Sequence, residues 1–138
     1  MRPIVGVLLF LMVVGLSVAP QMTQAQTKGP AVYSPAQAAR GKMLYDENCL
    51  MCHAPDLSGS PMAPPLGREL FTGRRRGTFR QLFDYVQLNM PIFSPNGLSR
   101  QQNADILAYM LQTAGFPAGS SEVPVATEAQ DAVKLAGQ

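Results

Sequence analysis

Three stretches of this chain repeat apolar residues at the three- and four-residue spacing of an amphipathic helix. The first covers residues 35–48 and follows Ser34, a helix-capping residue, with a proline at the first helical position. The second covers residues 79–88 behind Thr78, and the third opens at Ser99 with a capping box. The predicted buried positions are Ala38, Ala39, Met43 and Leu44 in the first helix, Phe79, Leu82, Phe83 and Val86 in the second, and Ile106, Leu107, Met110 and Leu111 in the third, which Gly115 ends. The pattern predicts an all-α domain with three main helices.

The first 25 residues have the organisation of a secretory signal peptide. Arg2 supplies an early positive charge, an unbroken apolar run covers residues 4–16, and small residues precede Gln26. We expect cleavage after Ala25 and a periplasmic location. The apolar run is shorter than the roughly 20 residues that span a bilayer, so an uncleaved membrane anchor is the less favoured alternative.

The rest of the chain is short enough for one small domain. Its composition is ordinary for a globular protein, with 46% hydrophobic and 14% charged residues, so we expect a folded core. We assign residues 26–30 to a short linker, 31–116 to the domain and 117–138 to a mostly disordered tail rich in small and polar residues. A short helix over residues 127–135 of that tail has little to pack against. The formal net charge of +2 names no partner.

Both cysteines and the only histidine of the chain lie within five residues. They are Cys49, Cys52 and His53, in the pattern Cys-x-x-Cys-His. Two thiols separated by two residues can add to the two vinyl groups along one edge of a porphyrin, and the adjacent imidazole then reaches the iron from the proximal face. The motif predicts one covalent haem c, with Cys49 and Cys52 as thioether residues and His53 as the proximal axial ligand.

Three other kinds of site use the same residue types. A structural zinc site needs four Cys or His ligands, and this chain has only three such residues in total. A thioredoxin-type dithiol opens a helix after a strand, but no strongly β-patterned run surrounds these cysteines. A disulfide, which export favours, leaves the adjacent histidine unexplained. The haem interpretation accounts for all three residues.

The second axial ligand of such a haem is a choice among a methionine, a lysine and an open five-coordinate iron, because no second histidine exists. Met90 follows the second predicted helix and precedes Pro91, in a loop that presents its thioether. Met62 lies only nine residues after His53 in a proline-rich segment, which keeps it near the proximal side. We therefore favour Met90 over Met62 as the distal ligand.

From residue 31 to residue 116 the order of these parts resembles the class I cytochrome c family. The resemblance rests on the attachment motif and on Gly41, Tyr45, Pro64, Pro65, Leu66, Met90, Pro91 and the stretch Ala108-Tyr109-Met110-Leu111. It implies a small cytochrome c fold wrapped around one haem. It also implies that Gly41 contacts Tyr109 where the first and last helices cross, and that the carbonyl of Pro64 or Pro65 accepts a hydrogen bond from the proximal imidazole.

Within that family the chain is similar to small single-haem domains that accept electrons from periplasmic dehydrogenases, including quinoprotein alcohol dehydrogenases. The likeness lies in three dipeptides: Met90-Pro91, Leu98-Ser99 and Ala108-Tyr109. The chain contains no tryptophan, the residue that often holds a haem propionate in these relatives. This departure from the family leaves the propionate contact open, and the candidate substitutes are Arg74, Arg75, Arg76 and Arg80.

A basic cluster at residues 74–76, bracketed by glycines and followed by Arg80, is the densest charge run in the chain. Arginine binds carboxylates through two parallel hydrogen bonds. We interpret the cluster as a clamp on the haem propionates, assigned first to Arg75, or as a docking patch for an acidic partner; a solvated loop is the alternative. One short cluster in an exported protein argues against nucleic-acid binding.

These features predict an electron carrier rather than an enzyme, because no bond to a substrate is needed and methionine ligation raises the haem potential. The expected partners are a redox donor and acceptor: a periplasmic dehydrogenase, a terminal oxidase or another cytochrome. Membrane contact requires an uncleaved signal. One alternative is a subunit stably docked to a dehydrogenase or oxidase. Another is an open-site haem enzyme or sensor, although no general acid or base besides His53 lies near the haem-binding segments.

Overall fold

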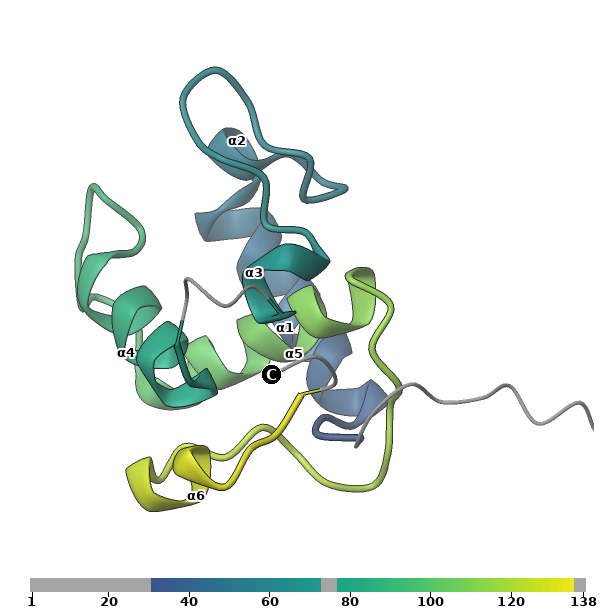
Figure 1. Ribbon diagram of the computed structural model, residues 1–138. Helices are drawn as coiled ribbons and strands as arrows, with labels where there is room; N and C mark the ends of the chain where they lie inside the picture. The colour runs from purple at the N-terminus through teal and green to yellow at the C-terminus, as the bar shows by residue number, and fades with distance from the viewer. Residues whose placement is uncertain (1–30, 73–76, 136–138) are drawn as a thin grey trace, which may run out of the picture.

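The computed structural model describes residues 31–72 and 77–135. Within these ranges the chain forms helices and no β-strand, with one isolated bridge between Ser60 and Ala63. The helices are α1 (Pro35–Asn48), α2 (Leu50–His53), α3 (Arg68–Thr72), α4 (Phe79–Asn89), α5 (Arg100–Thr113) and α6 (Thr127–Asp131). The predicted all-α domain is confirmed, and its three main helices are α1, α4 and α5 (Figure 1).

Several sequence predictions fall outside the described residues. They are the signal peptide with its cleavage after Ala25, the linker at 26–30, and the basic cluster at 74–76 that includes Arg75. None of the helices in the described residues combines the length and the apolar character of a membrane span. Export and the propionate role of Arg75 therefore stay predictions.

Each main helix begins where its capping pattern predicts. Ser34 caps α1 through its side-chain oxygen, which accepts a hydrogen bond from the backbone three residues on. Thr78 and Ser99 each form a capping box at the start of α4 and α5. Gly115, at φ 76°, lies just beyond α5 in the left-handed conformation that glycine favours. Local chemistry thus sets the ends of the helices that frame the core.

The α1 and α5 helices cross at the centre of the fold, and Gly41 sets how closely they approach (Figure 1). A Cβ atom added there would overlap the backbone carbonyl of Asp105 in α5, so only glycine fits. We expected Gly41 to contact Tyr109, and this contact stays a prediction. Because glycine leaves the backbone bare, the two helix backbones meet directly, and Tyr109 packs on Tyr45 with ring centroids 5.1 Å apart.

The buried face of α1 differs from the one its apolar residues predict. Met43 is 63% exposed and Ala39 is also exposed. The buried residues of α1 are Gln37, Ala38, Gly41 and Tyr45. The close crossing with α5 admits small and hydrogen-bonded residues, which an apolar pattern does not mark. In α4 and α5 every predicted core position is buried except Val86, which is partly buried.

The segment after residue 116 packs on the domain, so the prediction of a disordered tail was wrong for residues 117–135. Its apolar residues Val123, Val133 and Leu135 are 2%, 9% and 3% exposed. Gln37 of α1 bonds to both backbone groups of Val123, accepting from N–H at 2.7 Å and donating to the carbonyl at 3.3 Å. Composition did not predict this packing. The buried residues lie mostly outside helices, so no helical spacing of apolar residues marks them.

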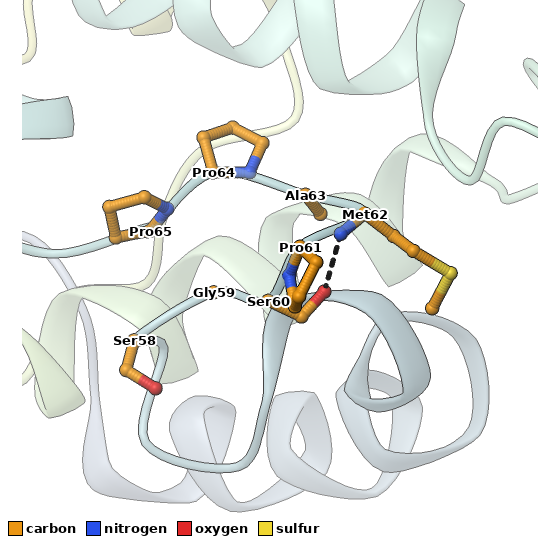
Figure 2. Close-up of a pocket in the computed structure, with 8 residues that line it drawn as sticks. All are labelled: Ser58, Gly59, Ser60, Pro61, Met62, Ala63, Pro64 and Pro65. Atoms are coloured by element: carbon orange, nitrogen blue, oxygen red, sulfur yellow. Dashed lines mark hydrogen bonds between the residues drawn. The ribbon is translucent and has the colours of Figure 1, made fainter.

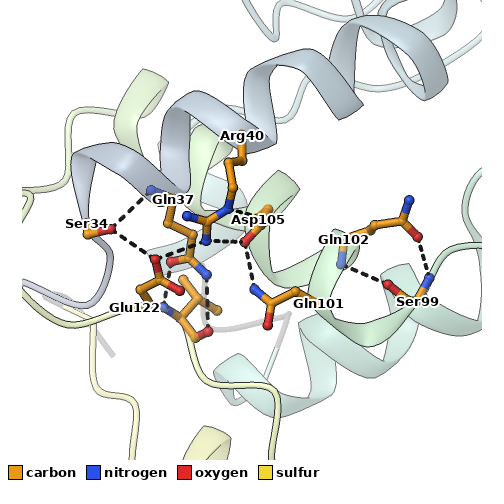
Figure 3. A network of polar contacts seen from close by, with 9 residues as sticks. Ser34, Gln37, Arg40, Ser99, Gln101, Gln102, Asp105 and Glu122 are labelled. Carbon is orange, nitrogen blue, oxygen red and sulfur yellow. Dashed lines mark hydrogen bonds and ion pairs between the residues drawn. The ribbon is translucent and has the colours of Figure 1, made fainter.

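A polar network ties this C-terminal segment to the helix crossing (Figure 3). Arg40 of α1 donates to both carboxylate oxygens of Asp105 in α5, at 3.0 and 3.1 Å, and to Glu122 at 3.0 Å. Gln101 donates to the same Asp105 carboxylate at 2.8 Å. The hydrogen bonds with Asp105 and then Glu122 raise the pKa of Arg40 above its ordinary value. The network therefore joins α1, α5 and the C-terminal segment.

Candidate functional site

A mainly apolar cleft lies between the loop that follows α2 and the end of α4 with its own loop. Its lining comprises Asn48, Cys49, Cys52, His53, Met62, Ala63, Pro64, Leu66, Leu70, Leu82, Tyr85, Val86, Met90, Pro91, Ile92, Phe93, Ile106 and Met110. The structure thus brings together the two cysteines, the histidine, one of the two predicted prolines and both candidate methionines. Pro65 does not line this cleft.

Helical backbone presents the Cys-x-x-Cys-His motif to one side of the cleft. The chain continues from α1 through Cys49 into α2, and the N–H of His53 donates to the Cys49 carbonyl at 3.0 Å. Cys52 and His53 follow Cys49 by three and four residues, which brings each to the side of the helical turn that Cys49 occupies, and all three line the cleft. The hydroxyl of Tyr45 donates to the carbonyl of Ala54 at 2.8 Å, which fixes the end of α2 against α1.

The His53 ring is oriented by a backbone carbonyl. His53 is 8% exposed, and its Nδ1 lies 3.0 Å from the carbonyl oxygen of Pro64, so Pro64 rather than Pro65 makes this contact. With Nδ1 as the donor, Nε2 carries the lone pair, and no hydrogen bond to Nε2 comes from any of the described residues. An imidazole held in this way is prepared to ligate a metal through Nε2.

Met62 lies in the loop that follows α2, beside a shallow hollow lined by residues 58–65 (Figure 2). The N–H of Gly59 donates to the carbonyl of His53 at 3.1 Å, and Ser60 Oγ accepts from the N–H of Met62 at 3.1 Å. These bonds hold the loop backbone. The Met62 side chain extends away from the loop in Figure 2 and is 72% exposed.

Met90 reaches the cleft from a different element. It is the C-cap residue of α4, its N–H donates to the Val86 carbonyl at 2.9 Å, and it is partly buried. After it, Pro91 is buried, whereas Ile92 and Phe93 at the cleft are 70% and 65% exposed. Of the two candidate ligands Met62 and Met90, Met90 is therefore the more enclosed.

The electrostatics of the cleft oppose dithiol chemistry. Burial, and then the neighbouring Cys52, raise the pKa of Cys49 to about 11, whereas redox-active Cys-x-x-Cys motifs depend on a lowered thiol pKa. Among the described residues, the lining includes no Asp, Glu, Lys or Arg. Arg80, considered for a propionate contact, does not line the cleft and pairs with Asp131 at 3.2 Å.

The residues present fit a covalently attached haem. Two thiols and a carbonyl-oriented imidazole come from one helical face, a thioether comes from a separate helix end, and the remaining wall is apolar. This is the donor set of a c-type haem with histidine and methionine as axial ligands. Sequence reasoning missed Tyr85, Ile92 and Phe93 as cleft residues. Ile92 and Phe93 follow Pro91 in a loop, where no helical period marks them.

The cleft and the helix crossing lie inside a region shared with known proteins. The family model described as cytochrome c oxidase, cbb3-type, subunit III, matches residues 36–110. Thiosulfate dehydrogenase of Thiomonas intermedia (strain K12) is 30% identical to this chain over 91 residues, which is 59% of this chain and 29% of that protein. This chain thus spans less than a third of that relative's length.

A solved structure shares the fold. The sulfane dehydrogenase SoxCD from Paracoccus pantotrophus matches with a TM-score of 0.51 and 23% sequence identity. The match covers 91% of this chain and 68% of the SoxCD chain. At this identity the likeness concerns the fold alone.

Proposed function

Because this chain belongs to the c-type cytochrome family described as cytochrome c oxidase, cbb3-type, subunit III, we propose that it is an exported carrier of single electrons with one covalent haem c. Membership makes it a cytochrome c domain suited to electron transfer. In our proposal Cys49 and Cys52 form the thioethers, His53 and Met90 are the axial ligands, and cleavage after Ala25 releases the protein into the periplasm.

One observation carries this proposal: the Cys-x-x-Cys-His motif and Met90 come from separate helices and line one apolar cleft. Haem c, when bound, supplies an iron that gains and loses one electron. Around it the chain anchors the cofactor through two thiols, orients His53 through the Pro64 carbonyl and excludes water with apolar side chains. A dry cleft and a methionine ligand favour the reduced state and raise the potential.

The mainly apolar lining of the cleft supports electron carriage. A haem enzyme that moves protons uses a distal acid or base. In the described part of the chain, the lining includes Tyr85 but no carboxylate, lysine or arginine. We assign the propionate contact to Arg75 on the sequence argument given above.

We propose a redox protein as donor and another as acceptor. The relatives named above are dehydrogenases of thiosulfate and of sulfane sulfur, so an enzyme that oxidises a reduced sulfur compound is the first donor to test. The match to only a part of the longer thiosulfate dehydrogenase favours a second candidate, a subunit stably docked to such an enzyme. Co-purification of the chain with a dehydrogenase under native conditions distinguishes the docked subunit from the free carrier.

Visible spectra and mass spectrometry of the purified protein test the proposal. We expect a mass increase of one haem, a mature N-terminus at Gln26, and a weak methionine-to-ferric-iron band in the far red. Met90→Ala should lose this band. Met62→Ala is the matched control, because Met62 lines the same cleft, and it should keep the band.

Two outcomes contradict the ligand assignment. If Met62→Ala loses the band and Met90→Ala keeps it, Met62 is the ligand. If the wild-type protein binds haem but is high-spin and takes up carbon monoxide readily, the sixth position is open and an enzyme or sensor becomes the leading function.

A further inference from the structure

One buried glutamine side chain bonds to the far end of the loop formed by residues 90–98. Gln87, in the last turn of α4, is 7% exposed. Its Nε2 donates to Asn96 Oδ1 and to the carbonyl oxygen of Leu98, both at 2.8 Å. Both acceptors lie at the far end of the 90–98 loop. A single amide therefore joins the start of the loop to its end.

Gln87 is in turn held by the next helix. Nδ2 of Asn103 in α5, a residue with 0% exposure, donates to Gln87 Oε1 at 2.8 Å. The Oδ1 atom of Asn103 is buried without a hydrogen-bond partner among the described residues, which is unfavourable for stability. A pair of apolar residues would avoid that penalty. The buried amides therefore specify the geometry of the loop more than they stabilise the fold.

Most of the loop has little else to hold it. Ile92 and Phe93 are 70% and 65% exposed, and residues 94–97 are exposed as well. Its internal backbone bonds, from Ser94 to Pro91 at 2.9 Å and from Gly97 to Ser94 at 3.0 Å, shape tight turns without tying the loop to a helix. The Gln87 amide supplies that tie, together with the partly buried Leu98 side chain.

We propose that Gln87 is a positioning residue for the distal ligand. By clamping the 90–98 loop it holds the Met90 thioether in the cleft and keeps competing ligands out of the sixth position. Gln87 itself does not line the cleft, so it acts through the loop. This inference rests on the proposed function, in which Met90 ligates the iron.

Competition by free imidazole for the sixth position tests the clamp. Gln87→Met keeps the side-chain volume and removes the amide, so the loop loses its two hydrogen bonds to Gln87, and the bond from Asn103 in α5 is lost as well. We expect imidazole to bind the ferric variant about tenfold more tightly than wild type, or tighter still, measured by absorbance titration. The far-red band should also weaken at a lower temperature than in wild type.

Two matched controls separate positioning from general destabilisation. Gln37→Met removes another buried glutamine, whose two hydrogen bonds go to the backbone of Val123, and should lower overall stability without changing imidazole affinity. Asn89→Ala removes an amide that adjoins Met90 and that, among the described residues, bonds only to the Tyr85 carbonyl within α4, at 2.9 Å; it should also leave the affinity unchanged.

The proposal is overturned if Gln87→Met binds imidazole as wild type does, or if Gln37→Met tightens binding equally. Should Gln87→Met fail to accumulate, Asn96→Gly provides the same test, because it removes one acceptor and tolerates the φ of 58° at this position. If wild type shows no methionine ligation, the proposed function fails separately. Amide hydrogen exchange then tests whether Gln87 holds the loop. The amides of residues 90–98 should exchange faster in the Gln87 variant than in wild type, and unchanged exchange refutes this role of Gln87.

Discussion

Replacing Gly41 by alanine should separate the two helices at the centre of the fold. The added Cβ atom would overlap the backbone oxygen and carbon of Asp105 and lie 3.0 Å from the backbone nitrogen of Ile106. All three are backbone atoms of α5, so no side-chain rotation relieves the overlap. The helices must move apart, and fully buried neighbours such as Ala38 and Tyr45 lose contacts across the crossing.

The expected magnitude follows from opposing effects. Alanine is favoured over glycine in a helix interior by about 1 kcal/mol. Overpacking against an immovable backbone costs typically about 1–3 kcal/mol and sometimes more, and each buried methylene group that loses its contacts adds about 0.8 kcal/mol. We expect the free energy of unfolding to fall by about 3 kcal/mol net, which corresponds to a decrease in Tm of roughly 10–20 °C for a domain of about 100 residues.

Chemical denaturation of the haem-loaded protein, followed by circular dichroism, measures this change. Gly67→Ala is the matched control, because the nearest atom to its added Cβ would be a carboxylate oxygen of Glu69 at 3.2 Å, at the end of a flexible side chain. Its effect should stay within about 0.5 kcal/mol. If Gly41→Ala is as stable as wild type, backbone contact does not set the α1–α5 crossing, and the reasoning is refuted.

Two further predictions test the packed C-terminal segment and the buried phenol of α1. Val123→Ala should lower the free energy of unfolding by about 2 kcal/mol, whereas the more exposed Val125→Ala should change it little; equal, negligible effects in thermal melts would mean that the segment does not pack. Burial raises the pKa of Tyr45 above its usual 10, so an unfolded chain releases this proton first and stability declines as pH rises above 10. This decline should be shallower in Tyr45→Phe than in wild type or Tyr85→Phe, measured as unfolding free energy against pH, and identical slopes would contradict the assignment.

Some features of this protein can be read from short pieces of sequence because their causes are local. Helix starts depend on side chains such as Ser34, Thr78 and Ser99 bonding to backbone groups three residues away. The spacing of three and four residues brings Cys52 and His53 each to the side of a helical turn that Cys49 occupies, whatever surrounds the helix. These interactions span less than two helical turns, so the pattern alone predicts them.

Other features depend on residues far apart in the chain. The backbone contact between Gly41 and Asp105, the exposure of Met43 and the packing of residues 117–135 all follow from how elements cross or cover one another. The hydrogen bonds that join Gln87 to Asn96, Leu98 and Asn103 cannot be predicted from the hydrophobic pattern either, because a glutamine in a helix is ordinarily exposed.

By itself the sequence determined the all-α class, the starts of the three main helices and the motif that places two thiols and an imidazole within five residues. Only the tertiary structure decided that Pro64 rather than Pro65 orients His53, that Met90 and the motif share one cleft, and that the C-terminal segment belongs to the folded core. The division has one physical reason. Capping and helical spacing are satisfied within a few residues, whereas burial depends on which distant surfaces meet.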